Sequence, residues 1–184
     1  MFNRCSPLED EKRSGIVQVY TGTGKGKTTA ALGLALRAAG HDQKGMIIQF
    51  MKGQIKYGEL SSIEDLPGLE IEQYGRADFV DKNDPDQVDI DFAKEGFDRA
   101  KEVLSEEEYD IVVLDEMNMV LDFELLEEKD VIEMLENKPP HMEIVLTGRN
   151  APPSIIDLAD LVTVMSEVKH PYMIGMDGRE GIEF

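Results

Sequence analysis

Short apolar runs alternate along the chain with longer segments that have helical periodicity. Apolar runs that are too short for a helix and are bounded by turn residues predict strands. These runs are GIVQVY (15–20), GMIIQF (45–50), LEIEQY (69–74), YDIVVLDEM (109–117), MEIVLTGRN (142–150) and LVTVMSEV (161–168), with an edge strand at GIEF (181–184). The pattern predicts helices over residues 28–40, 88–104, 123–138 and 152–160.

Alternation of strands and helices over the whole length predicts the α/β fold class. The sheet is expected to be mainly parallel, with helices on both faces. Ligands of such sheets bind at the carboxyl ends of the strands. We therefore examine the turns that follow the predicted strands for functional residues.

The pattern also indicates how the chain is divided. Residues 1–14 are polar and unpatterned, and they predict a flexible N-terminal arm. Residues 15–184 are expected to form a single nucleotide-binding catalytic domain, a size that one core accommodates. The single cysteine, Cys5, lies in the arm and cannot form an intramolecular disulfide, which fits a reducing compartment.

The first strand leads into TGTGKGKTT, a glycine-rich turn that opens a helix. It matches the P-loop pattern G-x-x-x-x-G-K-[ST] except that Thr21 replaces the first glycine. Glycines let backbone N–H groups converge on an anion, and the start of the helix adds its positive dipole end. Lys27 supplies a mobile charge for phosphate oxygens, and Thr28 supplies a hydroxyl for Mg²⁺. The sequence therefore predicts a bound nucleoside triphosphate.

Two further turns support this prediction. Asp115 and Glu116 end the apolar strand IVVLD, where a P-loop protein holds its Mg²⁺. Arg149 follows the strand that ends in LTGR, within reach of a polyphosphate. Together the three turns predict a magnesium-bound triphosphate, without indicating which of its bonds is broken.

The net charge and the lack of targeting signals limit the kinds of partner and the compartment that are expected for this protein. The formal net charge of −19 argues against nucleic-acid or anionic membrane surfaces, which favour basic side chains. No stretch is long and apolar enough to span a bilayer, and the first residues lack the apolar centre of a secretory signal. We expect a cytoplasmic protein that binds neither nucleic acid nor membrane.

The order of motifs resembles one known family. TGTGKGKTTAALGLALRAAGH, IIQFMKG followed by YGEL, YDIVVLDEMN, VLTGRNAPPSIIDLADLVT and VKHPYMIGMDGREGIEF are similar to segments of the P-loop type ATP:corrinoid adenosyltransferases. The resemblance covers residues 15–184, and that family also has threonine at the first P-loop position. It implies a RecA-like fold and a role in making adenosylcobalamin and its precursors.

The resemblance also implies the reaction and its residues. Reduced cobalt, Co(I), attacks the 5′ carbon of ATP, and the whole triphosphate leaves. Lys27, Glu116 and Arg149 match residues with catalytic roles, and Thr28, Asp115 and Glu116 match the Mg²⁺ site. Arg37 matches a nucleotide contact. The remaining matches lie in the phosphate loop, at Gly22, Thr23, Gly24, Lys25, Gly26 and Thr29.

The corrinoid side of the resemblance is less complete. Known members carry an aromatic pair after the third strand, which displaces the lower ligand of Co(II) and eases its reduction. This chain has YGRADFVDKND there and no tryptophan. Phe79 is the expected carrier of the role, with Tyr74 behind it, and simple packing is the alternative for both.

Partners and competing functions complete the predictions. The resemblance implies a homodimer, an electron-donating flavin or flavodoxin-like reductase, and an N-terminal arm that covers the site. From the residues alone, a P-loop ATPase or small-molecule kinase and a non-catalytic nucleotide-binding module remain alternatives, because a glutamate after the strand-end aspartate also positions water in hydrolases.

Overall fold

The computed structural model describes residues 14–53 and 57–183. A six-stranded sheet with the order β3-β2-β4-β5-β1-β6 forms its centre, and every neighbouring pair is parallel. Its strands are β1 (Val17–Thr21), β2 (Gly45–Phe50), β3 (Leu69–Tyr74), β4 (Ile111–Asp115), β5 (Glu143–Thr147) and β6 (Leu161–Val164). The predicted α/β class and parallel sheet are confirmed, as are the six strands within it.

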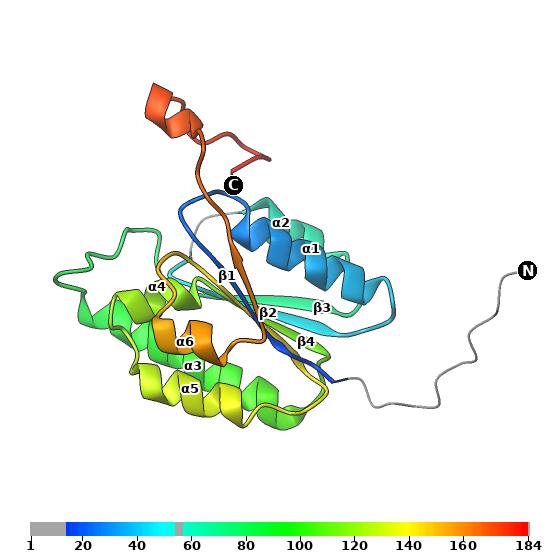
Figure 1. Ribbon diagram of the computed structural model, residues 1–184. Helices are drawn as coiled ribbons and strands as arrows, with labels where there is room; N and C mark the ends of the chain where they lie inside the picture. The colour runs from blue at the N-terminus through cyan, green and yellow to red at the C-terminus, as the bar shows by residue number, and fades with distance from the viewer. Residues whose placement is uncertain (1–13, 54–56, 184) are drawn as a thin grey trace, which may run out of the picture.

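Helices connect the strands and cover both faces of the sheet (Figure 1). One face carries α1 (Lys27–Ala39) and α2 (Gly58–Glu64). The other carries α3 (Gln87–Glu106), α4 (Met117–Asp122), α5 (Glu128–Glu136) and α6 (Pro153–Leu158). Each face has its own apolar cluster, and β2, β4 and β5 are buried along their whole length, which explains why they read as apolar runs. The outer strands β3 and β6 are more exposed.

Two element predictions are wrong at particular residues. The helix expected over 123–138 starts only at Glu128, because Glu124 adopts a positive φ of 55° and the preceding α4 has already ended at Asp122. The edge strand expected at GIEF is absent from its described part, where residues 181–183 form a turn and Gly181 has a φ of 74°. The sequence patterns also did not reveal the short helices α2 and α4.

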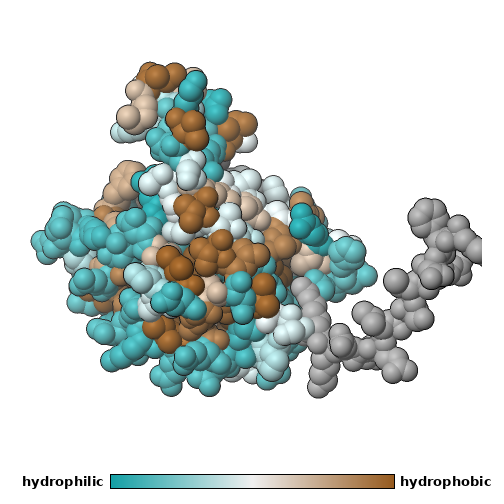
Figure 2. Space-filling view, viewed as in Figure 1, coloured by the Kyte–Doolittle hydropathy of each residue, from teal (hydrophilic) through white to brown (hydrophobic). Residues whose placement is uncertain are grey.

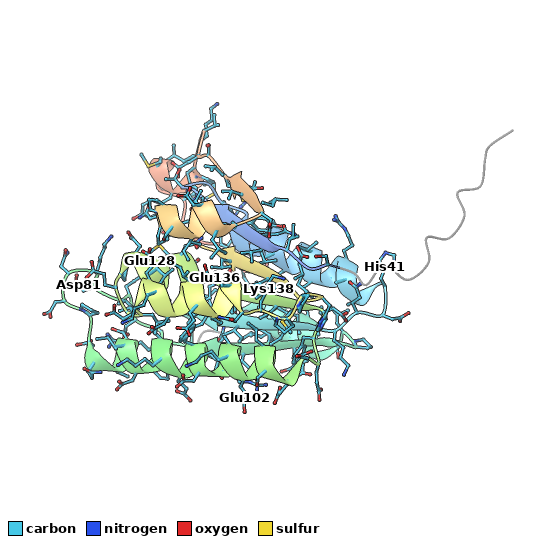
Figure 3. All side chains as sticks on the ribbon, turned by 60° about the horizontal axis from the view of Figure 1, so that its bottom comes forward. His41, Asp81, Glu102, Glu128, Glu136 and Lys138 are labelled. Carbon is cyan, nitrogen blue, oxygen red and sulfur yellow. The ribbon has the colours of Figure 1, made fainter. Side chains whose placement is uncertain are left out.

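Acidic side chains occupy the outer surface of the long helices. Figure 3 shows Glu102 on α3 pointing away from the sheet, and Arg99 of the same helix pairs with it at 2.8 Å. Exposed acids are solvated and cost little to ionise. Most carboxylates of residues 59–110 are exposed, so this acidic stretch forms a solvated face.

The segment after β6 leaves the sheet and carries a short 3₁₀ helix, η1 (Pro171–Ile174), before returning toward the loop between β1 and α1 (Figure 1). Lys25 of that loop holds its end, with Nζ 2.8 Å from Glu183 Oε1 and 3.0 Å from the Ile182 carbonyl oxygen. No helix among residues 14–53 and 57–183 is both long and apolar enough to cross a membrane. The predicted arm and Cys5 lie outside the described residues, apart from Ser14.

Two helical glycines provide a test of the packing between α3 and the sheet. A Cβ on Gly96 would lie 2.7 Å from Phe50 Cε1 and 2.9 Å from Tyr74 Cγ, whereas one on Gly33 of α1 would meet nothing within 4 Å. Gly96→Ala is expected to lower the free energy of unfolding by about 1–3 kcal/mol through overpacking. Gly33→Ala, the matched control, is expected to raise it by roughly 0.5–1 kcal/mol. Urea denaturation measures both, and equal effects would contradict the tight packing of α3.

Candidate active site

The phosphate loop occupies residues 22–26, between the end of β1 and the start of α1. Gly22 and Gly26 have positive φ values of 98° and 113°, which a residue with a side chain rarely adopts. Thr21 is the last residue of β1 and needs no such conformation. Its Oγ1 accepts a hydrogen bond from the Ala151 N–H at 3.3 Å, so the substituted position anchors a neighbouring loop.

Backbone from the end of β6 presses against this loop. The Gly24 N–H donates to the Met165 carbonyl oxygen at 2.7 Å, and a Cβ on Gly22 would lie 2.5 Å from the same oxygen. The glycines at 22 and 24 therefore permit close approach of a second backbone segment. The sequence argument had assigned them only to anion binding.

Lys27 lies at the centre of the loop. Its Nζ donates to the carbonyl oxygens of Gly22 at 2.9 Å and Gly24 at 2.8 Å, and the residue is only 9% exposed. Burial lowers the pKa of this ammonium, while the negative charge of Glu116 opposes the shift. The loop therefore surrounds the Lys27 ammonium, which has few contacts with solvent. A positive charge that is shielded from water in this way binds an anion strongly.

Asp115, at the end of β4, is fully buried and accepts hydrogen bonds from four side chains. Its Oδ1 receives the hydroxyls of Thr28 at 2.8 Å and Thr147 at 2.6 Å. Its Oδ2 receives Gln49 Nε2 at 3.1 Å and Lys52 Nζ at 2.7 Å. These donors come from α1, β5, β2 and the turn after β2, so one carboxylate joins the phosphate loop to three parallel strands.

Glu116 follows in a left-handed conformation, with a φ of 65°. Its N–H donates to Thr147 Oγ1 at 3.0 Å. Burial raises the pKa of its carboxyl group, and the adjacent charge of Asp115 adds to the increase. This turn aims the second carboxylate into the same cavity that Lys27 and Thr28 line.

The turn after β5 packs directly against the Glu116 turn. Gly148 has a φ of 127°, and a Cβ there would lie 3.0 Å from the Met119 backbone nitrogen. The fully buried Asn118 donates its Nδ2 to the Gly148 carbonyl oxygen at 3.2 Å, and its Oδ1 has no hydrogen-bond partner among the described residues. Asn118 therefore fixes the turn that presents Arg149.

A cavity of about 540 Å³ opens over these groups. Its floor is the loop from Lys25 to Thr29 with Glu116, and its walls are Lys52, residues 57–59 of the α2 segment, and residues 181–183 of the tail. A cavity of this size accommodates a polyphosphate with part of a nucleoside. It lies at the carboxyl edge of the sheet, as expected for this fold class.

The residues present fit a magnesium ion of the P-loop kind. Thr28 Oγ1 and Asp115 Oδ1 are 2.8 Å apart, and Glu116 lies beside them. Residues 14–53 and 57–183 contain no cluster of three His, Cys, Asp or Glu side chains arranged to cage a metal. Mg²⁺ is commonly held by one or two carboxylates together with water and substrate phosphates, so a sparse set of protein ligands suits it.

Other predicted site residues lie at the rim. Arg149 is exposed and lines a second cavity of about 1000 Å³, together with Gly24, Lys25 and residues 166–173 of the tail. Thr29 lines the first cavity, and Thr23 Oγ1 accepts a hydrogen bond from the Glu167 N–H at 3.4 Å. The tail after β6 therefore borders both cavities.

Two predicted residues are not brought to the loop. Arg37 lies ten positions beyond Lys27, about 15 Å along the axis of α1, and borders a small cavity with Gln18 and Glu143. The arrangement adds no support for a nucleotide contact by Arg37. Phe79 lies in the loop between β3 and α3 with its side chain fully exposed, at 102%. Tyr74 packs beneath α3 and donates its hydroxyl to Glu72 at 2.6 Å.

Sequence reasoning missed Gln49, Lys52, Asn118 and Thr147. Thr147 lies within the recognised motif LTGR, Asn118 lies two residues after LDE, and the position of Gln49 inside an apolar strand was an unused signal. A polar residue in a fully buried strand needs a buried partner, and here the partner is Asp115. Lys52 lies in IIQFMKG, a segment of the family resemblance, but nothing local indicated its partner, which is 63 residues away.

Comparison with known proteins identifies the family. Residues 13–184 match the family described as ATP:corrinoid adenosyltransferase BtuR/CobO/CobP. The corrinoid adenosyltransferase of a Sinorhizobium species is 37% identical over 177 residues, covering 95% of this chain and 82% of that protein. Those of Escherichia coli K12 and Pseudomonas aeruginosa are 34% and 35% identical over 98% of this chain, and the matches cover 90% and 88% of their lengths. The family match covers nearly the whole chain, and the structure has a P-loop cavity beside a buried strand-end aspartate. This protein therefore belongs to the ATP:corrinoid adenosyltransferase family.

Proposed function

We propose that the phosphate loop of this corrinoid adenosyltransferase holds the triphosphate of ATP as a leaving group. The enzyme transfers the adenosyl group of ATP to the cobalt of a corrinoid. The observation that carries the proposal is the position of Lys27, buried at the loop centre and facing the cavity beside Thr28 and Asp115.

The reaction requires stabilisation of the charge on the leaving triphosphate and alignment of the cobalt with the 5′ carbon. A cobalt–carbon bond forms at the 5′ carbon as the bond from that carbon to its ester oxygen breaks, and the oxygen keeps the electron pair. Co(I) carries no proton that has to be removed, so the nucleophile needs no general base. The Lys27 ammonium and the loop N–H groups stabilise the departing negative charge, and the cavity aligns the reacting atoms.

The acidic residues have a separate task in this proposal. Bound Mg²⁺ would neutralise part of the triphosphate charge, and Thr28, Asp115 and Glu116 are the residues that would hold it. Arg149 is free to turn from the rim toward the phosphates, because it is exposed and has no hydrogen-bond partner among the described residues. Its guanidinium matches phosphate oxygens in a two-point contact.

Lys27→Ala is expected to abolish turnover, a loss of at least about 100-fold, because one preorganised charge donor is typically worth that much. The assay mixes protein, Mg-ATP and chemically reduced cobalamin without oxygen, and it follows adenosylcobalamin and triphosphate. Circular dichroism checks the fold, and Lys94→Ala on the exposed surface of α3 is the control. Formation of ADP and phosphate by the wild type, or an active Lys27→Ala, would reject the proposal.

Reduction of Co(II) to Co(I) needs an electron from outside, and we assign its supply to a flavin or flavodoxin-like reductase. Phe79 is proposed to help by displacing the lower ligand of the cobalt. It fits this role because its ring is fully exposed, on a loop that follows the carboxyl end of β3. A large exposed aromatic ring has no packing role in the described structure.

Phe79→Ala is expected to slow the reaction from Co(II) with a weak reductant by about 10-fold, if the contact with the ring is worth about 1.4 kcal/mol. The reaction from preformed Co(I) should change much less, because the ligand has then already been lost. Phe79→Tyr serves as the matched aromatic control. Equal slowing of both reactions would remove Phe79 from cobalt activation.

A homodimer is the final part of the proposal. Among the described strands β6 pairs only with β1, which leaves its other edge open. Its sequence LVTV carries no charge in a strongly acidic chain, and hydrophobic side chains gather in the middle of the face shown in Figure 2. Leu161, Val162 and Val164 of β6 are exposed, as is Ile156 of α6. An open apolar edge of this kind suits pairing with a second copy.

Val162→Glu is expected to convert the dimer to a monomer in sedimentation velocity experiments, because it places like charges opposite each other across a two-fold axis. Val88→Glu on α3 is the matched control, since Val88 is 41% exposed and Val162 is 37% exposed. A dimer that survives Val162→Glu would show that the two copies meet on another surface.

A further inference from the structure

The turn after β2 is held in an uncommon conformation. Met51 has a positive φ of 55°, and its N–H donates to the Tyr74 carbonyl oxygen at 2.9 Å. A Cβ on Gly53 would lie 2.1 Å from the Gly75 carbonyl oxygen, and one on Gly75 would lie 2.5 Å from the Lys52 nitrogen. The turns after β2 and β3 are therefore pressed together, and this contact directs the Lys52 side chain back over the sheet edge.

Lys52 reaches Asp115 from this turn. Its Nζ lies 2.7 Å from Asp115 Oδ2 and 5.3 Å from the centre of the Tyr57 ring, and its side chain is 15% exposed. Burial works to lower the pKa of Lys52, but the charge and hydrogen bond of Asp115 outweigh it and raise the pKa. Lys52 is therefore a charged ammonium in the wall of the cavity that Lys27 lines.

The four donors use all the acceptor positions that a carboxylate offers. A cation that binds Asp115 must therefore displace one of them. Gln49 and Thr147 are fully buried, at 0% exposure, and have no space to withdraw. Thr28 also lines the cavity, but its hydroxyl can keep donating to Asp115 while a lone pair of its oxygen binds the ion. Lys52 is partly exposed at the end of a flexible stem and faces the open cavity, so it is the donor that can move there.

We infer that Lys52 is a second triphosphate-binding lysine, held by Asp115 until a magnesium-bound triphosphate enters. When the ion takes its place on Asp115, the ammonium moves to the phosphate oxygens within the same cavity. Lys52 then adds a second positive charge to the cavity that Lys27 also lines, where the leaving group gains charge. This inference rests on the proposed role of the phosphate loop.

The test measures binding of inorganic triphosphate by titration calorimetry, with Mg²⁺ and with EDTA. Lys52→Gln is expected to weaken binding by about 10-fold or more in Mg²⁺, which is about 1.4 kcal/mol. In EDTA it should change binding less than about 3-fold, because Lys52 then stays on Asp115. Lys52→Arg keeps the charge and should retain most of the binding, and Lys94→Gln is the surface control.

The outcomes separate this inference from the proposed function. Loss of binding by Lys27→Ala, together with unchanged or tighter Mg²⁺-dependent binding by Lys52→Gln, would overturn only the role of Lys52 and leave it as a counterion of Asp115. Unchanged binding by Lys27→Ala, or no binding by the wild type, would overturn the proposal that the phosphate loop binds the triphosphate.

A second measurement keeps the inference testable if Lys52→Gln does not fold. In wild-type protein labelled with ¹⁵N-lysine, the Nζ resonance that Lys52→Arg removes belongs to Lys52. That resonance is expected to shift when triphosphate is added in the presence of Mg²⁺, and to stay in place when triphosphate is added in EDTA. A resonance that does not respond to magnesium-bound triphosphate would contradict the movement.

Discussion

A fully buried carboxylate, Asp115, is the constraint on which the site depends. Burying a charge is costly unless hydrogen bonds and an opposite charge compensate it. Here two hydroxyls, an amide and an ammonium do so, and they reach Asp115 from α1, β5, β2 and the turn after β2. Each donor reaches Asp115 only if its strand or helix is correctly placed. The network therefore links the position of the phosphate loop to the register of the central strands.

The parallel sheet makes this network possible. All six strands run in the same direction, so their carboxyl ends meet at one edge and every following turn faces the same region. The extension of β6 then contacts the loop at Gly22 and Gly24, and the tail returns to Lys25. The site is therefore enclosed by segments that follow the last strand as well as by the loop.

Local signals predicted most of the fold. Apolar runs located the six strands, most clearly β2, β4 and β5, because a strand covered on both faces is apolar on both sides. The errors lie where local propensity was not decisive. Glu124 interrupts an apparently continuous helix by turning the chain with a positive φ. Residues 181–183 form a turn that, within the described part of the chain, Lys25 alone ties to a distant segment by hydrogen bonds. Neither feature follows from the periodicity of the segment.

The sequence by itself determined the phosphate loop, the strand-end acids and the α/β class. Each of these depends on residues that are close together in the chain, so their types and spacing are sufficient to predict it. Only the tertiary structure decided which residues complete the site. Lys52, Gln49 and Thr147 join the predicted Thr28 at Asp115, across separations of 32 to 66 residues. Arg37, equally visible in the sequence, lies at the far end of its helix from Lys27. Burial and strand order determine which side chains lie at Asp115, and neither can be read from a single motif.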